Sequence, residues 1–157
     1  MRPSRPTSTV PSRTNPTPLG VVRRSDPELR RIVVRVRAWG LERGRACNSD
    51  ALTTIVGVAV DEARTGCTSP RWWTSGRVEQ VLTAGVSGFC AARELGLPPG
   101  LAPAMALWLD YLGAQGALGP GSEPLERLHL AVGVGRRRAV DRRRRATAGH
   151  PASGGRR

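Results

Sequence analysis

Residues 25–40 read SDPELRRIVVRVRAWG, and this stretch predicts where a helical domain begins. Ser25 can cap a helix, Pro27 suits its first turn, and Glu28 completes a capping box three residues after Ser25. Apolar residues then recur at helical spacing, namely Leu29, Ile32, Val33, Val36 and Trp39. With Gly44 as the stop, the pattern predicts a helix over residues 26–43.

A second helix is predicted after Asn48-Ser49-Asp50, which supplies an N-cap. One face of this segment is apolar, and Gly66 terminates it; the face consists of Leu52, Ile55, Val56, Ala59 and Ala63. The same segment is rich in β-branched residues, so a strand over 54–60 is the alternative. The helical period and the Asp61-Glu62 end favour the helix.

Three more helices are indicated by the same signals. Thr74 is the predicted N-cap of a third helix, which ends at Gly96 and in which Trp73 packs against Val78. After the turn at residues 98–100, a fourth helix has an apolar face of Leu101, Met105, Trp108, Leu109 and Leu112. A short fifth helix follows Ser122 and carries Leu125, Leu128 and Val132. Of the tryptophans, we expect Trp39 and Trp108 to be buried and Trp72 to be exposed.

These segments predict an all-α fold, a compact bundle of four to five short helices with disordered basic N- and C-terminal tails. All 25 basic residues are arginine. Residues 25–135 hold 11 arginines and 11 acidic residues, residues 1–24 hold five arginines and no acid, and residues 136–157 hold nine arginines and one acid. We therefore expect a disordered Arg/Pro/Ser/Thr tail over 1–24, a helical domain over 25–135 and an Arg-rich disordered tail over 136–157.

The candidate nucleic-acid-binding residues are arginines of the C-terminal tail and of the first helix: Arg136, Arg137, Arg138, Arg142, Arg143, Arg144, Arg145, Arg30, Arg31 and Arg35. The seven arginines in the tail can neutralise several phosphates of nucleic acid or of another polyanion. The alternative for the tail is a solvated segment with no specific partner, since neither tail has an aromatic residue to stack on bases. The alternative for the first helix is a solvated face whose arginines pair with Asp61, Glu62 or Glu79.

A helix-turn-helix regulator is the alternative function. Residues 89–98 read FCAARELGLP and resemble the first helix and turn of winged-helix regulators of the IclR type, and residues 111–118 resemble the end of their recognition helix. This resemblance implies DNA-binding helices at about 86–95 and 100–115. A recognition helix needs donors and cations at its N-terminal end, and residues 100–108, GLAPAMALW, supply none. We expect instead that Leu101, Met105 and Leu109 are buried against the first and third helices.

From Ser25 to Val134 the chain also resembles uncharacterised arginine-rich helical proteins of high-GC actinobacteria. The likeness lies in the end of the first helix near Trp39, in Trp73-Thr74, and in the stretch MALWLDYL at residues 105–112. This resemblance implies one compact helical domain and carries no activity.

No pattern for catalysis or for cofactor binding occurs in the sequence. It has no G-x-S-x-G, H-E-x-x-H or glycine-rich phosphate loop, and Cys47, Cys67 and Cys90 lack metal-ligand spacing. We expect buried free thiols, no metal, no cofactor and no enzymatic activity. Met1 to Val10 has no apolar signal segment and the apolar runs are too short for a bilayer, so we expect a cytoplasmic protein without a membrane partner. The expected function is that of an interaction or accessory protein, with nucleic acid or another protein as its partner.

Overall fold

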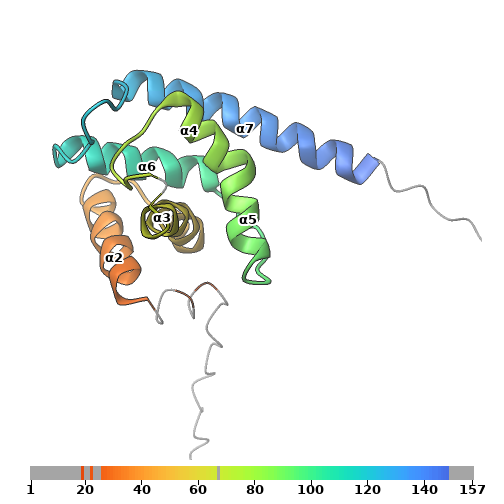
Figure 1. Cartoon of the computed structure of the whole chain (residues 1–157), viewed down its shortest axis with the longest axis horizontal. Helices are drawn as coiled ribbons and strands as arrows, with labels where there is room; N and C mark the ends of the chain where they lie inside the picture. Colours follow the sequence, from red (N-terminus) through yellow and green to blue (C-terminus); the bar gives the residue numbers. More distant parts are fainter. Residues whose placement is uncertain (1–18, 20–21, 23–25, 67, 149–157) are drawn as a thin grey trace, which may run out of the picture.

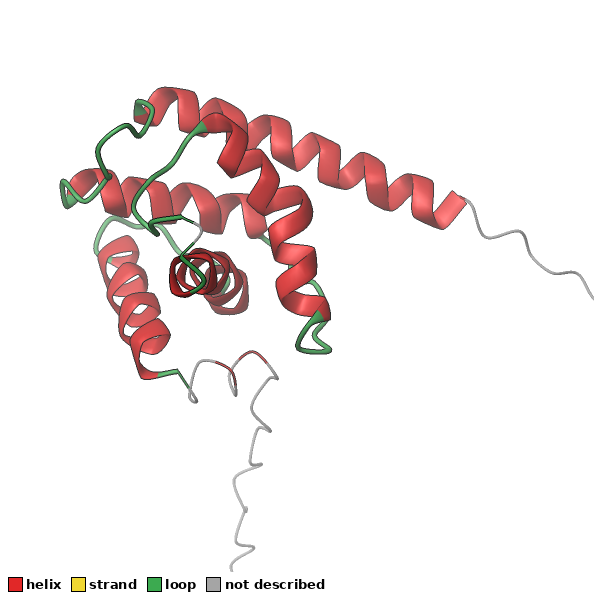
Figure 2. Cartoon of the chain, viewed as in Figure 1, coloured by secondary structure: helices red, strands yellow, loops and turns green. Residues whose placement is uncertain are grey.

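The structure is a computed structural model that describes residues 19, 22, 26–66 and 68–148, with only the backbone described at residues 139 and 141–148. Its elements in chain order are α2 (Pro27–Leu41), α3 (Ser49–Arg64), α4 (Ser75–Gln80), the π-helical turn η1 (Val81–Gly85), α5 (Val86–Ala91), α6 (Leu101–Ala114) and α7 (Leu125–Ala148). Elements α4, η1 and α5 follow without a break and form one helix. The described residues contain no strand (Figure 2), so the predicted all-α bundle is confirmed.

Helix α3 lies at the centre of the bundle, and Figure 1 shows it end-on between the other helices. Residues 51–60 are all buried. A helix that is buried on every side has to be apolar on every side, and this explains its many β-branched residues. The hydroxyls of Thr53 and Thr54 donate to the carbonyls of Ser49 and Asp50, at 2.7 and 2.9 Å. The predicted helix is confirmed, and the alternative of a strand over 54–60 was wrong. The prediction that only one face of this helix is buried was also wrong.

Helix α6 packs against α2, α3 and α7. Met105 and Leu109 are fully buried, as predicted, whereas Leu101 is only partly buried. The predicted third helix, α4–η1–α5, is not among these neighbours of α6, so the prediction that α6 packs against it was wrong. Trp108 is buried, and Trp39 is partly buried at the edge of the core, where the Arg43 guanidinium lies 4.3 Å from the centre of its indole ring.

Side-chain caps begin α2, α3 and α4, and two of the three caps lie at the predicted residue. Asn48 accepts from the backbone N–H groups of Asp50 and Ala51, and Thr74 accepts from that of Arg77. At α2 the cap is Asp26, whose Oδ1 accepts from the N–H of Leu29 at 3.1 Å, and not Ser25. The Arg64 guanidinium also bonds Asp26 and thereby lowers the pKa of its carboxyl.

The third helix ends earlier than predicted. Its α-helical residues stop at Ala91, and the left-handed position that closes the end is Glu94, with φ at 54°, not Gly96. The N–H of Leu95 bonds back to the carbonyl of Cys90 at 2.9 Å. Gly44, Gly66 and Gly116 hold the left-handed positions near the ends of α2, α3 and α6, as predicted.

A buried arginine joins α3, α4 and the loop between them. The side chain of Arg77 is 5 % exposed, and its Nη2 lies 2.7 Å from Oε2 of Glu62. Its Nη1 donates to the carbonyl of Ser69 at 2.7 Å and to that of Trp72, and the guanidinium stacks 4.3 Å from the Trp73 ring centre. The charge is therefore both paired and hydrogen-bonded, as burial requires.

Trp73 anchors a second loop, the one that leads into α7. Its indole N–H donates to the carbonyl of Pro70 at 3.0 Å, and the residue is fully buried, as is Val78. Its backbone N–H donates to the Ser122 hydroxyl, and its carbonyl accepts from the N–H of Glu123 at 2.9 Å. The start of α7 is thus fixed to the start of α4.

The predicted disordered N-terminal tail falls mostly outside the described residues. Two of its positions are described, and the prediction was wrong for both. Leu19 is 5 % exposed and belongs to the hydrophobic core, and Val22 packs against that core. These apolar side chains sit close enough in sequence to α2 to reach the core.

Replacing Arg77 by alanine should lower the free energy of unfolding by about 3–5 kcal/mol, because it removes a buried cation and leaves Glu62 and the carbonyls of Ser69 and Trp72 without their donor. Arg77→Lys should also destabilise, since a single ammonium lacks the planar fork. Chemical denaturation measures both effects. Arg30→Ala, at an exposed position, is the control and should change stability by no more than about 0.5 kcal/mol. An Arg77→Ala variant as stable as that control would refute the role of the network.

Replacing Glu94 by glycine should raise the free energy of unfolding by about 0.5–1 kcal/mol, because glycine adopts a positive φ without steric cost. The matched control is Glu126→Gly, in the first turn of α7, where the backbone is helical and the same change should destabilise. Thermal unfolding distinguishes the two directions. A destabilised Glu94→Gly variant would contradict the strain assigned to this position.

Candidate nucleic-acid interface

The arginine-rich segment 136–145 is helical and continues α7 to Ala148 (Figure 1). The prediction of a disordered tail was therefore wrong for residues 136–148, while residues 149–157 lie outside the described residues. Residues earlier in α7 pack against α4 and α6, so the helix is already nucleated where the arginines begin. Extending a helix with arginine and alanine then costs little.

Close packing at Gly135 fixes where the extension leaves the bundle. A Cβ on Gly135 would lie 2.9 Å from Cδ1 of Leu82 and 3.8 Å from Cα of Glu79, so only glycine fits without a shift. One helical turn later, Arg138 pairs with Glu79. Past this point the extension projects from the rest of the bundle (Figure 1).

The first arginines of the extension face solvent. Arg136 and Arg137 are exposed, and within the described part of the chain neither lies within 4.0 Å of a carboxylate. Arg138 is exposed as well, but it has Glu79 as its partner. Arg142, Arg143, Arg144 and Arg145 follow on the next two turns of the helix backbone.

The candidate arginines of α2 form a separate surface. Arg30, Arg31 and Arg35 are exposed, together with Val34 on the same helix. The acids predicted as their partners are taken by arginines of other elements: Asp61 by Arg93 at 2.5 Å, Glu62 by Arg77 and Glu79 by Arg138. That predicted pairing was wrong for α2, and among the described residues no carboxylate lies within 4.0 Å of these three arginines.

The two arginine groups do not combine into one face. Figure 1 shows α2 on one side of the bundle and the end of α7 projecting from the other. A ligand can therefore contact the arginines of α2 without contacting those of α7, and each group can be tested alone.

Helix α6 does not present the surface that a DNA-reading helix needs. Its first turn is partly buried, Ala104 and Met105 are fully buried, and residues 92–100 separate it from α5. Helix-turn-helix units join their two helices by a turn of three to four residues. The sequence already indicated that α6 does not read DNA, since residues 100–108 contain no cation and no side-chain donor before Trp108.

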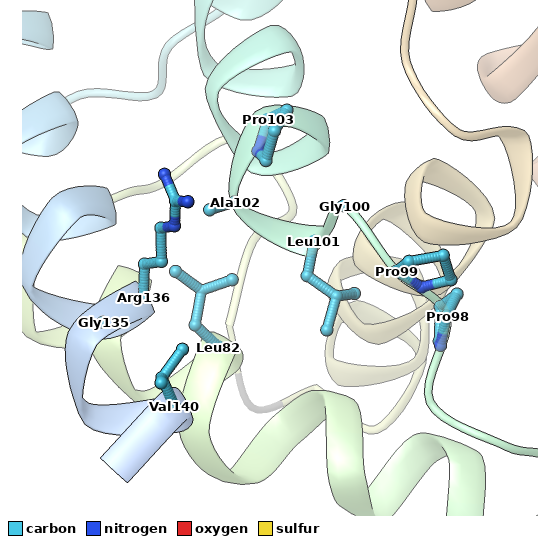
Figure 3. A pocket seen from close by; sticks show the side chains of 10 residues that line it. All are labelled: Leu82, Pro98, Pro99, Gly100, Leu101, Ala102, Pro103, Gly135, Arg136 and Val140. Carbon is cyan, nitrogen blue, oxygen red and sulfur yellow. The ribbon is translucent and has the colours of Figure 1, made fainter. Parts of the chain in front are cut away.

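A cavity of about 270 Å³ lies beside the exit of α7, and sequence reasoning did not indicate it. Figure 3 shows its wall, which combines Leu82, the N-terminal end of α6 with the residues 98–100 before it, and one side of α7. The α7 residues are Gly135, Arg136 and Val140. The only signal in the sequence is Val140, an apolar residue between two arginine clusters.

Other polar groups in the structure serve local contacts. His129 bonds Asp110 at 2.6 Å, and Arg45 pairs with the same carboxylate, so the three link α7, α6 and the segment after α2. Burial raises the pKa of the Cys47 and Cys90 thiols, which therefore stay protonated at neutral pH. Cys47 is only partly buried, Cys90 is buried as predicted, and Cys67 lies outside the described residues. Over the described ranges, no three metal-ligating side chains cluster, and no helix has the length and apolar character to cross a membrane.

Deleting the residues after Gly135 should remove helical signal equivalent to about 13 residues, because residues 136–148 belong to α7. Far-ultraviolet circular dichroism of the full chain and of residues 1–135 measures the difference. Ala139→Pro in the full chain is a second test, since proline breaks a helix interior. Identical spectra for the three proteins would show that the extension is not helical in solution.

Comparison of the chain with protein-family models, with curated proteins and with solved structures found no match.

Proposed function

We propose that this chain is a non-catalytic binding protein that associates with the phosphate backbone of duplex nucleic acid through the extension of α7. The observation that supports the proposal is the placement of seven arginines on the end of one helix, four of them at positions 142–145 on the part that projects from the bundle. A projecting helix is accessible to a large polyanion. A ligand of that size would not fit into an enclosed pocket.

The distribution of the arginines around the helix favours a polyanion. At 100° per residue, positions 136, 137, 138, 142, 143, 144 and 145 lie on nearly all sides of the α7 axis. A helix with charges on all sides repels itself, and phosphates that approach from several directions relieve this repulsion. The extension of 13 residues is about 20 Å long and has the width that enters a major groove.

The proposed association is independent of base sequence. Arginine contacts to phosphates give affinity and orientation but no base recognition. Among residues 136–148 no aromatic residue occurs that would stack on bases, and no asparagine or glutamine that would read an adenine. Release of counterions then provides most of the binding free energy, so the affinity falls steeply with salt.

Arg30, Arg31 and Arg35 of α2 provide a second, weaker surface in this proposal. They are three charges on one short helix, and they lie away from the extension. Met105, in the helix that would have to read DNA, is buried, and nothing else favours the helix-turn-helix alternative. A helix-turn-helix regulator is therefore not proposed as a second function.

The test titrates a labelled DNA duplex with the full chain at several salt concentrations. Replacing Arg142, Arg143, Arg144 and Arg145 by glutamine should weaken binding, because each arginine removed leaves one phosphate with its counterion. The slope of log affinity against log salt should fall by about 3–4, at about 0.9 for each phosphate that is no longer neutralised. The control variant carries Arg30→Gln, Arg31→Gln and Arg35→Gln, and should retain most of the affinity.

Three outcomes would overturn the proposal. The first is an unchanged affinity and salt slope in the α7 variant. The second is loss of binding in the α2 variant alone, which would move the interface to α2. The third is equal competition by polyglutamate and by unlabelled duplex at equal charge, which would make the extension a general polyanion surface.

A further inference from the structure

The cavity beside the exit of α7 has the features of a small-ligand site, and it lies at the base of the arginine-rich extension, where Arg136 forms part of its wall. Its volume is about 270 Å³. From its position and its chemistry we propose that it binds a short aliphatic carboxylate, with the hydrocarbon tail between Leu82, Leu101 and Val140 and the carboxylate at Arg136.

The lining favours an apolar tail. Leu82, Leu101, Ala102 and Val140 supply hydrocarbon from three different elements, as Figure 3 shows. Residues 98, 99 and 103 of the wall are prolines, which have no backbone N–H to donate. A polar group that enters this cavity loses its hydrogen bonds to water and finds few donors in the wall to replace them, which is unfavourable. A hydrocarbon chain has no such hydrogen bonds to lose.

The charge at the rim favours an anionic head. Arg136 is the charged side chain of the described lining, and Figure 3 shows it extending from α7 toward Ala102. Within the described residues it lies near no carboxylate, unlike Arg138, whose partner is Glu79. One guanidinium matches a single negative charge, and its planar fork fits a carboxylate. A neutral alcohol of the same length gains nothing from this contact.

The volume limits the length of the tail. At about 30 Å³ for each non-hydrogen atom, which is the share of one water molecule in the liquid, the cavity holds about nine atoms. Hexanoate is of this size. Longer chains extend past the cavity into solvent, so affinity should rise with chain length up to hexanoate and then level off.

The experiment titrates the full chain with hexanoate and with 1-hexanol and follows backbone amide shifts by NMR. We expect saturable binding of hexanoate, amide shifts centred on residues 100–102 and 135–140, and weaker binding of the alcohol. Arg136→Gln should reduce hexanoate affinity about two- to fivefold, as expected for an exposed ion pair, and should abolish the preference over the alcohol. Arg137→Gln removes the same charge from the adjacent position, outside the described lining, and should keep that preference.

A second pair of variants tests the cavity itself. Ala102→Leu places a larger side chain in the wall and should abolish binding of both ligands. Ala38→Leu adds the same atoms on the exposed side of α2 and should leave binding unchanged. Non-saturable shifts, equal affinity for acid and alcohol in the unmodified chain, or retained binding in Ala102→Leu would each overturn the proposal. Because no nucleic acid is present, the result does not depend on the function proposed for α7.

Discussion

Burial of α3 on every side is the constraint on which the rest of the structure depends. A helix with ten consecutive buried residues cannot exist unless α2, α6 and the α4–η1–α5 helix surround it. Close approach on one of these sides needs Gly57, where a Cβ would lie 2.6 Å from Phe89. Once α3 is covered, the remaining elements have little freedom, and α7 packs on the outside of that cover against α4 and α6.

The polar contacts of Arg77 explain how the cover is kept in place. Its guanidinium reaches α3 through Glu62 and the loop before α4 through two carbonyls, while the neighbouring Trp73 bonds the loop that starts α7. The end of α3, the loop before α4 and the distant loop before α7 are thereby fixed around one side chain and its aromatic neighbour. An isolated hydrophobic contact would join them without setting their relative orientation.

Much of this fold follows from short-range signals. Asn48 and Thr74 cap helices at the predicted positions because a cap needs only the residues next to it. The sequence did not reveal that α3 is covered all round, because the packing of other helices decides that property. Glu94 was missed for another reason: its positive φ follows from the way the helix end folds back on Cys90, and a glycine two residues later was the stronger signal.

The candidate site was also predictable from the sequence only in part. The arginines were identified from the sequence, but the helix that carries seven of them was not, because a charged segment taken alone does not nucleate a helix. Docking of residues 125–135 supplies that nucleus. The cavity could not be predicted at all, since residue 82, residues 98–103 and residues 135–140 meet only when the chain is folded.

Because α7 packs on the bundle at Gly135 and Leu82 and projects further along, a small change of its angle at the base would shift its far end. The bundle holds the helix as far as Arg138, and the part beyond it, residues 139–148, is about 15 Å long. A rotation of about 10° at the base of this part would move its tip by about 2.6 Å, about three quarters of the rise of one base pair along a duplex. A side chain larger than glycine at position 135 would first displace the Leu82 methyl group 2.9 Å away, so the base of the projecting part depends on a contact inside the bundle.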